Sequence, residues 1–257
     1  MEFYKYHGTG NDFIIIDNRK GDITLSQEQI AHLCTRRFNI GADGLMLLEH
    51  AEGYDFRMVY YNADGSESTM CGNGGRCMAA FAKELGIITD AAKFIAIDGE
   101  HVATLHANGQ VRLQMNNVSE VQQMDGHSIL NTGSPHYVKW VENVVDIDVY
   151  GEGHKIRYSP AYELAGINVN FVQRITEGKL LVRTYERGVE DETLSCGTGV
   201  TAAAIAATGD ATGHFTAEVE TPGGLLQVTF NKVTQSSATN VMLTGPAVFV
   251  CRGDVMI

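Results

Sequence analysis

Two segments of this chain repeat the same short pattern, and this repeat constrains the fold more than any other feature of the sequence. Cys71-Gly72-Asn73-Gly74 aligns with Cys196-Gly197-Thr198-Gly199 at an offset of 196 − 71 = 125 residues. The same offset places Glu67 on Glu192 upstream, and the segment 101–105 on the segment 226–230 downstream. Chance similarity between Gly-rich turns is the alternative. A register that holds from Glu67 to residue 105 favours a tandem duplication of one structural unit.

The residues around this repeat are typical of short strands with few helices. Many stretches are apolar or alternate with β-branched residues, and turn pairs such as Asn108-Gly109 separate several of them, which is the pattern of hairpins. Helices are expected at about 26–36, after a capping pattern, and in the Ala-rich segments 75–85 and 199–207. We therefore predict an α+β fold with two similar lobes, joined near residue 116.

Composition argues against several classes of partner. The 257 residues include 19 basic and 31 acidic side chains, a formal net charge of −12, so we expect no nucleic acid and no membrane partner. Hydrophobic residues make up 44% of the chain, as in ordinary globular proteins. The N-terminus lacks a secretory pattern, and no apolar run approaches the ~20 residues of a membrane span. We expect a cytoplasmic protein.

The five cysteines fall into two groups. An odd number without a secretory signal predicts reduced thiols, and Cys34, Cys77 and Cys251 are expected to be small buried hydrophobic residues. Cys71 and Cys196 differ because each precedes a Gly-rich helix start. There the unpaired N–H groups and the helix dipole lower the pKa of a thiol and favour the thiolate.

A helix N-terminus also binds anions, so a substrate carboxylate is expected between the two helix starts, in a cleft between the lobes. Its α-carbon would then lie between two sulfur atoms. One thiolate would remove the α-proton from one face, and the opposite thiol would donate a proton to the other face. The sequence thus predicts a two-base racemase or epimerase that needs no cofactor, because the oriented donors can stabilise the developing negative charge.

Other sites explain these residues less well. We predict no metal site, because Cys71 and Cys77 are six residues apart and have no neighbouring His pair. A nucleotide site would need a GxGxxG or a Lys-Ser/Thr pattern, and neither Gly-rich segment has one. A redox dithiol remains an alternative although the pair lacks Cys-x-x-Cys spacing. A non-catalytic amino-acid-binding protein is a further alternative.

Several loops contain polar clusters that could bind a zwitterion. Taken singly, each is explained equally well by turn chemistry. Together they could supply donors and acceptors, with Arg187 pairing a carboxylate and Glu186 binding an ammonium group. The clusters are His7 to Asp12, Tyr61 to Gly65, Gly133 to His136, Asn168 to Asn170 and Tyr185 to Gly188.

These motifs resemble those of the diaminopimelate epimerase family, and the resemblance runs through most of the chain. It implies cofactor-independent interconversion of LL- and meso-diaminopimelate on the route to lysine and peptidoglycan. It also implies two pseudosymmetric lobes, each a β-barrel-like sheet wrapped around a central helix. The lobes would comprise residues 1–115 with a returning strand at 247–257, and residues 116–246. The stretches that carry the resemblance are 7–13, 41–44, 61–67, 70–74, 168–171, 185–188, 195–199 and 222–224.

The resemblance also implies a role for each matching residue. Cys71 and Cys196 would be the two bases, and the backbone N–H groups of Gly72, Asn73, Gly197 and Thr198 would bind the reacting carboxylate. His136 and Glu186 would lie beside the reacting centre. The residues that would hold the remaining amino and carboxylate groups are Asn11, Asn62, Asn168, Glu186 and Arg187. Homodimers are common in this family, so we expect a homodimer.

Two departures from the family pattern stand out. Many members have Asn-Pro-His where this chain has Ser134-Pro135-His136, so a substrate-binding amide becomes a hydroxyl of shorter reach. Some members have Gln at the position of Gly44. Neither departure replaces a base. Proline racemases and hydroxyproline epimerases share the fold and the cysteine pair and remain the main alternative, but a compact imino acid would not need Glu186 and Arg187 at a distal end.

Overall fold

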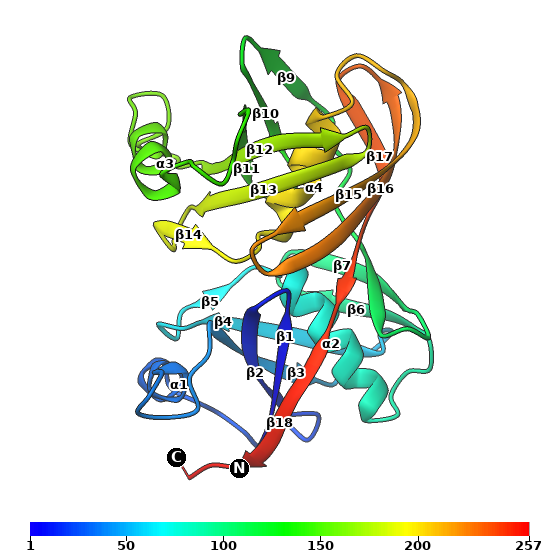
Figure 1. Ribbon diagram of the computed structural model, residues 1–257. Coiled ribbons are helices and arrows are strands. Elements are labelled where there is room, and N and C mark those ends of the chain that lie inside the picture. The colour runs from blue at the N-terminus through cyan, green and yellow to red at the C-terminus, as the bar shows by residue number, and fades with distance from the viewer. Residues whose placement is uncertain (257) are drawn as a thin grey trace. The chain divides into compact units, whose positions relative to one another are not determined.

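The computed structural model describes residues 1–256, and their contacts divide the chain into two compact units (Figure 1). Unit 1 comprises Met1–Leu113 together with the C-terminal segment from Gly245, and unit 2 comprises Gln114–Thr244. Strands predominate, and the described residues contain four helices. The predicted α+β fold class is confirmed.

Unit 1 is a continuous series of paired strands. The pairing order is β18, β1, β2, β3, β4, β6, β7, β8, and the short β5 adds a second partner along part of β4. The β2–β3 and β4–β6 pairs are parallel and the others antiparallel. The bounds are β1 (Glu2–Gly8), β2 (Asn11–Asp17), β3 (Gly44–Glu49), β4 (Phe56–Asn62), β5 (Glu67–Ser68), β6 (Ala91–Ala96), β7 (Gly99–Leu105), β8 (Gln110–Gln114) and β18 (Val248–Asp254).

Unit 2 follows the same plan. The pairing order is β9, β10, β11, β12, β13, β15, β16, β17, with the short β14 on β13. The β11–β12 and β13–β15 pairs are parallel. The bounds are β9 (Val121–Met124), β10 (His127–Asn131), β11 (Pro135–Trp140), β12 (Asn168–Thr176), β13 (Lys179–Glu186), β14 (Asp191–Thr193), β15 (Gly213–Thr221), β16 (Gly224–Thr234) and β17 (Ser237–Pro246).

The two pairing orders match strand for strand, including the two parallel pairs. Strand β2 corresponds to β11, β3 to β12 and β4 to β13. Strand β18 takes the place in unit 1 that β9 has in unit 2. The topology therefore repeats in the way that the Cys-Gly pattern predicts, and unit 1 takes its outermost strand from the far end of the described chain.

One helix packs against the strands of each unit. Helix α2 (Gly72–Glu84) contacts β1, β2, β3, β4 and β7, and α4 (Gly197–Ala206) contacts β10, β11, β12, β13, β15 and β16. Both helices begin directly after a cysteine, slightly earlier than the predicted starts at 75 and 199. Their Gly and Ala residues are mostly buried, and α2 also buries the larger side chains of Arg76, Met78 and Phe81.

Two further helices lie outside this plan. Helix α1 (Gln27–Cys34) follows Ser26, and both hydrogen bonds of the predicted capping box are present. Helix α3 (Val149–Arg157) was not predicted from the sequence. Its start is fixed by Asp148, whose carboxylate accepts a hydrogen bond from the Gly151 N–H.

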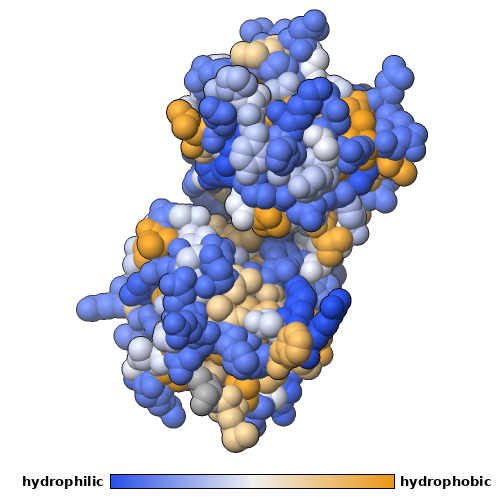
Figure 2. Space-filling view, turned by 90° about the vertical axis from the view of Figure 1, so that its left-hand side faces the viewer, coloured by the Kyte–Doolittle hydropathy of each residue, from blue (hydrophilic) through white to orange (hydrophobic). Residues whose placement is uncertain are grey.

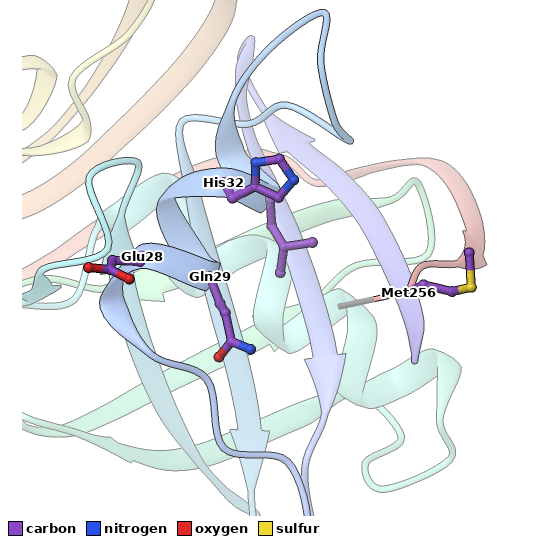
Figure 3. Close-up of a pocket in the computed structure, with 5 residues that line it drawn as sticks. Glu28, Gln29, His32 and Met256 are labelled. Carbon is purple, nitrogen blue, oxygen red and sulfur yellow. The ribbon is translucent and has the colours of Figure 1, made fainter.

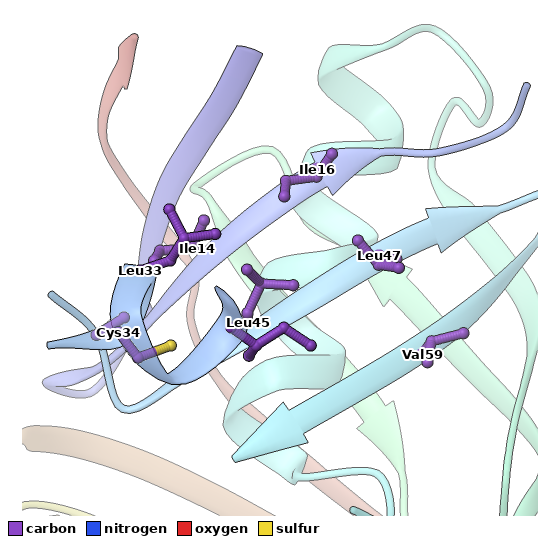
Figure 4. Close-up of a cluster of buried hydrophobic side chains, with 9 residues drawn as sticks. Ile14, Ile16, Leu33, Cys34, Leu45, Leu47 and Val59 are labelled. Atoms are coloured by element: carbon purple, nitrogen blue, oxygen red, sulfur yellow. The ribbon is translucent and has the colours of Figure 1, made fainter. Parts of the chain in front are cut away.

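Part of the unit 1 core lies between α1 and the sheet. Ile14 and Ile16 on β2, Leu45 and Leu47 on β3, and Val59 on β4 are two residues apart along their strands or lie opposite one another, so they share one face. Figure 4 shows Leu33 and Cys34 of α1 beside these strands. Burial raises the pKa of the Cys34 thiol to about 12, which makes it a packing residue as predicted.

The surface corrects one prediction. Cys77 is buried, but Cys251 is exposed and lies on β18, most of whose residues are exposed. Strand β18 pairs with β1 at the end of the unit 1 strand order, and its successive side chains are exposed on both faces. Hydrophilic residues cover most of the face in Figure 2, with scattered apolar spots. Within the described residues, no helix is long and apolar enough to span a membrane.

Candidate active site

In unit 2, strand register gathers several of the predicted site residues at one end of the sheet. Strands β11 and β12 are parallel and β13 is antiparallel to β12, so the starts of β11 and β12 lie beside the end of β13. His136 pairs in register with Asn168. Ser134 immediately precedes β11, and Glu186 is the last residue of β13. All four therefore lie at the same end.

The start of α4 lies against this end of the sheet. Cys196 is the N-cap residue, with extended backbone and a buried side chain. Gly197 and Thr198 form the first turn of the helix, where backbone N–H groups have no acceptor within the helix. A Cβ atom on Gly199 would overlap the amide of Asn170 on β12. Glycine therefore allows this helix start to approach β12.

A chain of hydrogen bonds joins the sheet to this cysteine. The Nδ2 of Asn170 lies 3.1 Å from His136 Nδ1, and His136 Nε2 lies 3.0 Å from Ser134 Oγ. Ser134 Oγ is 3.3 Å from Thr198 Oγ1, which is 3.4 Å from Cys196 Sγ. The structure thus brings together three predicted binding residues and a predicted base.

His136 is held in its neutral form. Its side chain is fully buried, and burial, followed by the positive charge of Arg187, lowers the pKa of the imidazole to about 3. A neutral imidazole carries one proton on one of its two nitrogens. His136 can therefore donate one hydrogen bond and accept another, but it does not carry a charge near neutral pH.

The turn after β13 holds the predicted distal ligands. Asn168 Oδ1 accepts a hydrogen bond from the backbone N–H of Arg187 at 2.9 Å, which ties this turn to β12. The Arg187 side chain is exposed, and its Nη1 donates to the Ala165 carbonyl. Glu186 accepts a hydrogen bond from the Thr193 hydroxyl at 2.8 Å. A carboxylate and a guanidinium therefore stand on consecutive residues.

Unit 1 forms a second cluster around Cys71, the N-cap residue of α2. Cys71 Sγ is 3.7 Å from Asn11 Oδ1, which also accepts a hydrogen bond from Asn73 Nδ2 at 3.3 Å. Asn11 Nδ2 donates to Asp43 at 2.8 Å, which fixes the orientation of the amide. Two residues predicted to bind substrate therefore surround the predicted base.

Asn62 lies at the same end of the unit 1 sheet but belongs to a different set of contacts. It is the last residue of β4 and pairs in register with Gly44 at the start of β3. Its side chain donates to the Ser66 hydroxyl at 3.3 Å. The structure thus places Asn62 near the sheet end where β2 also begins, within the turn that leads to β5.

Sequence reasoning missed Arg76, a fully buried charged residue in the first turns of α2. Its guanidinium donates to Asn73 Oδ1 at 3.0 Å, to the Thr9 hydroxyl, and to the carbonyls of Gly72 and Pro246. Burial lowers the pKa of this group, but arginine stays protonated in proteins. A charged residue directly between Gly74-Gly75 and Cys77 was the available signal.

Asn170 was missed as a positioning residue, although it lies two residues after Asn168 and hence on the same face of the strand. It donates to the carbonyl of Tyr137 at 3.2 Å and accepts from Thr184 at 3.0 Å. It also contacts His136, so an amide that is not itself a predicted ligand orients a residue that is. The alternation Asn-Val-Asn was the sequence signal.

Two surface hollows are lined by other residues, although the second includes Thr193, the partner of Glu186. The first, of about 230 Å³, is lined by Glu28, Gln29, His32 and Leu33 of α1 and by Met256 after β18 (Figure 3). The second, of about 410 Å³, lies in unit 2 beside the Arg183–Glu192 ion pair. Neither contains a predicted site residue. Residues 1–256 hold no group of three or more side chains suited to a metal ion.

The sequence matches the family model "Diaminopimelate epimerase" over residues 3–121 and 128–250. A diaminopimelate epimerase of Flavobacterium psychrophilum is 55% identical, in an alignment that covers 97% of this chain and 98% of the relative. One of Chlorobaculum tepidum is 42% identical and covers 97% of this chain and 99% of the relative.

Solved structures with low identity share the fold. A phenazine biosynthesis protein of the PhzF family from Bacillus anthracis has a TM-score of 0.75 at 15% identity, with coverage of 100% of this chain and 99% of the other. A probable proline racemase from Agrobacterium radiobacter K84 has a TM-score of 0.71 at 15% identity, with coverage of 100% and 93%. These likenesses confirm the predicted fold, and the matches along the sequence confirm the predicted family. The chain belongs to the diaminopimelate epimerase family.

Proposed function

We propose that this protein interconverts LL- and meso-diaminopimelate, with Cys71 and Cys196 as its two acid–base groups. The observation that supports this most directly is that each cysteine is the N-cap residue of a mostly buried helix, in a chain of the diaminopimelate epimerase family. Inversion at an α-carbon needs a base on one face and an acid on the other. A repeated Cys-Gly helix start supplies that chemistry twice.

The proton balance of the reaction follows from this pair. The thiolate takes the α-proton and becomes a thiol, while the other thiol gives its proton to the opposite face and becomes a thiolate. The substrate keeps the same number of protons, and its configuration at this carbon is inverted. Because thiol protons exchange with water, the new α-hydrogen of the product comes from solvent.

The helix starts would hold the reacting carboxylate. Backbone N–H groups of Gly72, Asn73, Gly197 and Thr198 belong to the first turns of α2 and α4, and the positive ends of helix dipoles favour an anion there. When the α-proton leaves, negative charge spreads onto this carboxylate. Oriented N–H donors stabilise that charge without rearranging, which lowers the barrier to proton removal.

The distal end of the substrate needs partners for an ammonium and a second carboxylate. We assign these roles to Asn11, Asn62, Asn168, Glu186 and Arg187. Support comes from the sheet ends, where Asn168 holds the Arg187 backbone and Glu186 precedes it directly. His136 and Ser134 would lie nearer the reacting carbon, beside Cys196, because they are linked to that cysteine through Thr198.

The test is incubation of reduced protein with LL-diaminopimelate in deuterated water, without pyridoxal phosphate, followed by NMR. Meso product with one α-deuterium is the expected result. Proline and hydroxyproline run in parallel, and inversion of either instead would move the protein to the racemase alternative. Absence of exchange with all three would overturn the proposal and favour a redox or binding role.

Three further properties belong to this proposal. The two units would be the two lobes of the family fold, with lobe boundaries near residues 115 and 247. The protein would act as a homodimer in the cytoplasm, in the lysine and peptidoglycan precursor pathway of its family. Size-exclusion chromatography with light scattering tests the dimer, and a monomeric mass for the active enzyme would contradict it.

A further inference from the structure

Four side chains of unit 2 lie in a row that ends on Cys196, and the direction of each hydrogen bond in that row can be derived from its neighbours. The row runs from Asn170 through His136 and Ser134 to Thr198. The distance between two polar atoms does not show which one donates the hydrogen. The direction of each hydrogen bond is therefore deduced from neighbouring groups that can only donate or only accept. Two amides, each held by a backbone group, supply these fixed points.

The first fixed point is Asn170. Its Nδ2 lies 3.2 Å from the carbonyl of Tyr137, which can only accept, so this atom is the NH₂ group. The same Nδ2 faces His136 Nδ1 at 3.1 Å. His136 Nδ1 must therefore accept. Since the imidazole is neutral, its proton is on Nε2, which donates to Ser134 Oγ at 3.0 Å.

The second fixed point is Asn168. Its Oδ1 accepts from the backbone N–H of Arg187, and its Nδ2 lies 3.0 Å from the Pro135 carbonyl, so its orientation is also fixed. This Nδ2 donates to Ser134 Oγ at 3.1 Å. Ser134 Oγ thus accepts from both His136 and Asn168, which occupies both of its lone pairs. Its single proton is directed to Thr198 Oγ1 at 3.3 Å.

The last step concerns Thr198. Its Oγ1 accepts from Ser134, so its own proton is free to donate to Cys196 Sγ at 3.4 Å. We infer that Ser134 is a positioning residue that makes the Thr198 hydroxyl donate to the Cys196 sulfur, which stabilises the Cys196 thiolate. We call this row of hydrogen bonds, from Asn170 to Thr198, the relay. This role of Ser134 rests on the proposed function of Cys196 as a base. It goes beyond the substrate contact expected of Ser134 from its sequence position.

The charged residues beside this row act on other groups. Arg187 acts on the His136 imidazole by its charge, and Glu186 accepts a hydrogen bond from the Thr193 hydroxyl. Unit 1 offers a contrast in the same molecule. Asn11 stands where Ser134 stands in unit 2, and its Oδ1, not a hydroxyl, faces Cys71. Cys71 is therefore an internal control, since Ser134 belongs only to the Cys196 cluster.

The experiment measures alkylation of each thiol by iodoacetamide in ligand-free protein, with peptide mass spectrometry to separate Cys196 from Cys71. The rate at pH 6.5 is divided by the rate at pH 9.5 for each thiol, which removes differences in access. Only the thiolate reacts. For Ser134→Ala we expect the Cys196 ratio to fall about tenfold, while the Cys71 ratio is unchanged.

Three matched variants sharpen the test. Thr198→Val removes the donor itself, so the Cys196 ratio should fall at least as far as in Ser134→Ala. Ser134→Thr keeps the hydroxyl and should restore the ratio. Thr132→Val removes a hydroxyl that donates to the Thr198 carbonyl, outside the relay, and should leave the ratio near that of the unmodified chain.

An unchanged Cys196 ratio in Ser134→Ala would overturn the inference. So would equal falls at Cys196 and Cys71, since that result would indicate a general loss of structure. Kinetics add a second criterion: a relay lowers kcat and is restored by Ser134→Thr, whereas a substrate contact alone raises KM. Because alkylation needs no substrate, it decides the relay even if the deuterium experiment disproves the epimerase activity.

Discussion

The starts of α2 and α4 are built on one plan but surround their cysteines with different chemistry. At the matching offset of 125 residues, Asn73 corresponds to Thr198 and Arg76 to Thr201. Thr9 and Thr132, 123 residues apart, each reach these positions, Thr9 through the Asn73 side chain and Thr132 through the Thr198 carbonyl. The arrangement of the helix starts is therefore preserved, and the residues that differ lie in the first turns of the two helices.

The comparison indicates that duplication preserved the position of each cysteine at a helix start, whereas substitutions changed the polar and charged groups around it. Unit 1 places an amide oxygen beside Cys71 and a buried guanidinium one turn into the helix. Unit 2 places a hydroxyl beside Cys196, and the residue that replaces Arg76, Thr201, only donates back to the Gly197 carbonyl of its own helix. The two proposed catalytic thiols therefore have matching positions in their units but different polar neighbours.

The strongest test of this comparison removes each sulfur in turn. Cys71→Ala and Cys196→Ala should each lower kcat by about 10²–10⁴-fold, the usual contribution of a general acid or base. The measurement is epimerisation of LL-diaminopimelate followed by NMR. Both variants should fold, since neither cysteine side chain makes a capping bond at its helix. Appreciable turnover by either variant would contradict the two-base mechanism.

Gly199 and Gly74 are matched positions that should respond unequally to alanine. A Cβ at residue 199 overlaps the Asn170 amide that orients His136, whereas a Cβ at residue 74 meets the flexible ends of Met46 and Met58. We expect Gly199→Ala to lower kcat/KM by about 10²-fold, since small displacements at a reacting centre are costly. Gly74→Ala is the control.

For Gly74→Ala we expect a much smaller loss in the same assay, because a thioether can rotate away. Circular dichroism of both variants checks that the fold is retained. Equal losses at the two positions would mean that the start of α4 is no more tightly packed than that of α2.

Arg76 and Thr201 should differ in their contribution to stability. Arg76→Met removes the donors of four acceptors, three of them in buried hydrogen bonds, and should lower the free energy of unfolding by about 2 kcal/mol. Thr201→Val removes one hydroxyl that bonds a helix carbonyl and should cost less than about 1 kcal/mol. Denaturant unfolding measures both.

Arg76→Lys is the conservative variant for this comparison. A lysine cannot reproduce the planar fork that reaches several acceptors at once, so we expect little recovery of stability. Full recovery would show that the charge, and not the fork, holds the start of α2 in place.

The smallest effect concerns acid stability of unit 2. Burial lowers the pKa of His136 to about 3, whereas an unfolded histidine has a pKa of about 6.5. Below pH 6.5 the unfolded chain therefore binds a proton at residue 136 that the folded chain does not bind. The free energy of unfolding is unaffected by this proton above pH 6.5 and decreases as the pH falls towards 3. Unfolding free energies at pH 5 and pH 7.5 should differ more in the unmodified protein than in His136→Gln.

Phe13 occupies in unit 1 the place of His136 in unit 2, since Phe13 pairs with Gly44 as His136 pairs with Asn168. It has no proton to gain, so unit 1 lacks this source of acid sensitivity. An identical pH dependence in His136→Gln would show that the imidazole is not the group responsible.

The sequence was sufficient for the features that depend on local pattern. The two Cys-Gly helix starts, the capping box at Ser26 and the strand-rich organisation all follow from short-range rules. The family followed from ordered motifs along the chain. Helix α3 escaped prediction because its composition is polar and its start depends on one Asp148 carboxylate.

Contacts that join distant residues could not be derived in this way. The sequence identified Ser134 and His136 as candidate ligands, but it could not show that Thr198, more than sixty residues away, completes a row to Cys196. Burial of Arg76 likewise depends on the sheet that surrounds α2. The substrate-binding roles of the remaining residues stay predictions.

The pairing of β1 with β18 has a consequence for how the protein is made. The ribosome makes β1 before, and β18 after, all strands of unit 2. Unit 2 is contiguous from 114 to 244, so all of its strands precede β18 and none of them needs β18 as a partner. Unit 1 must wait with one edge of β1 open, and such an edge is prone to pair with other chains. A chain cut before β18 would therefore contain every strand of the second unit but lack the strand that pairs with β1 in the first.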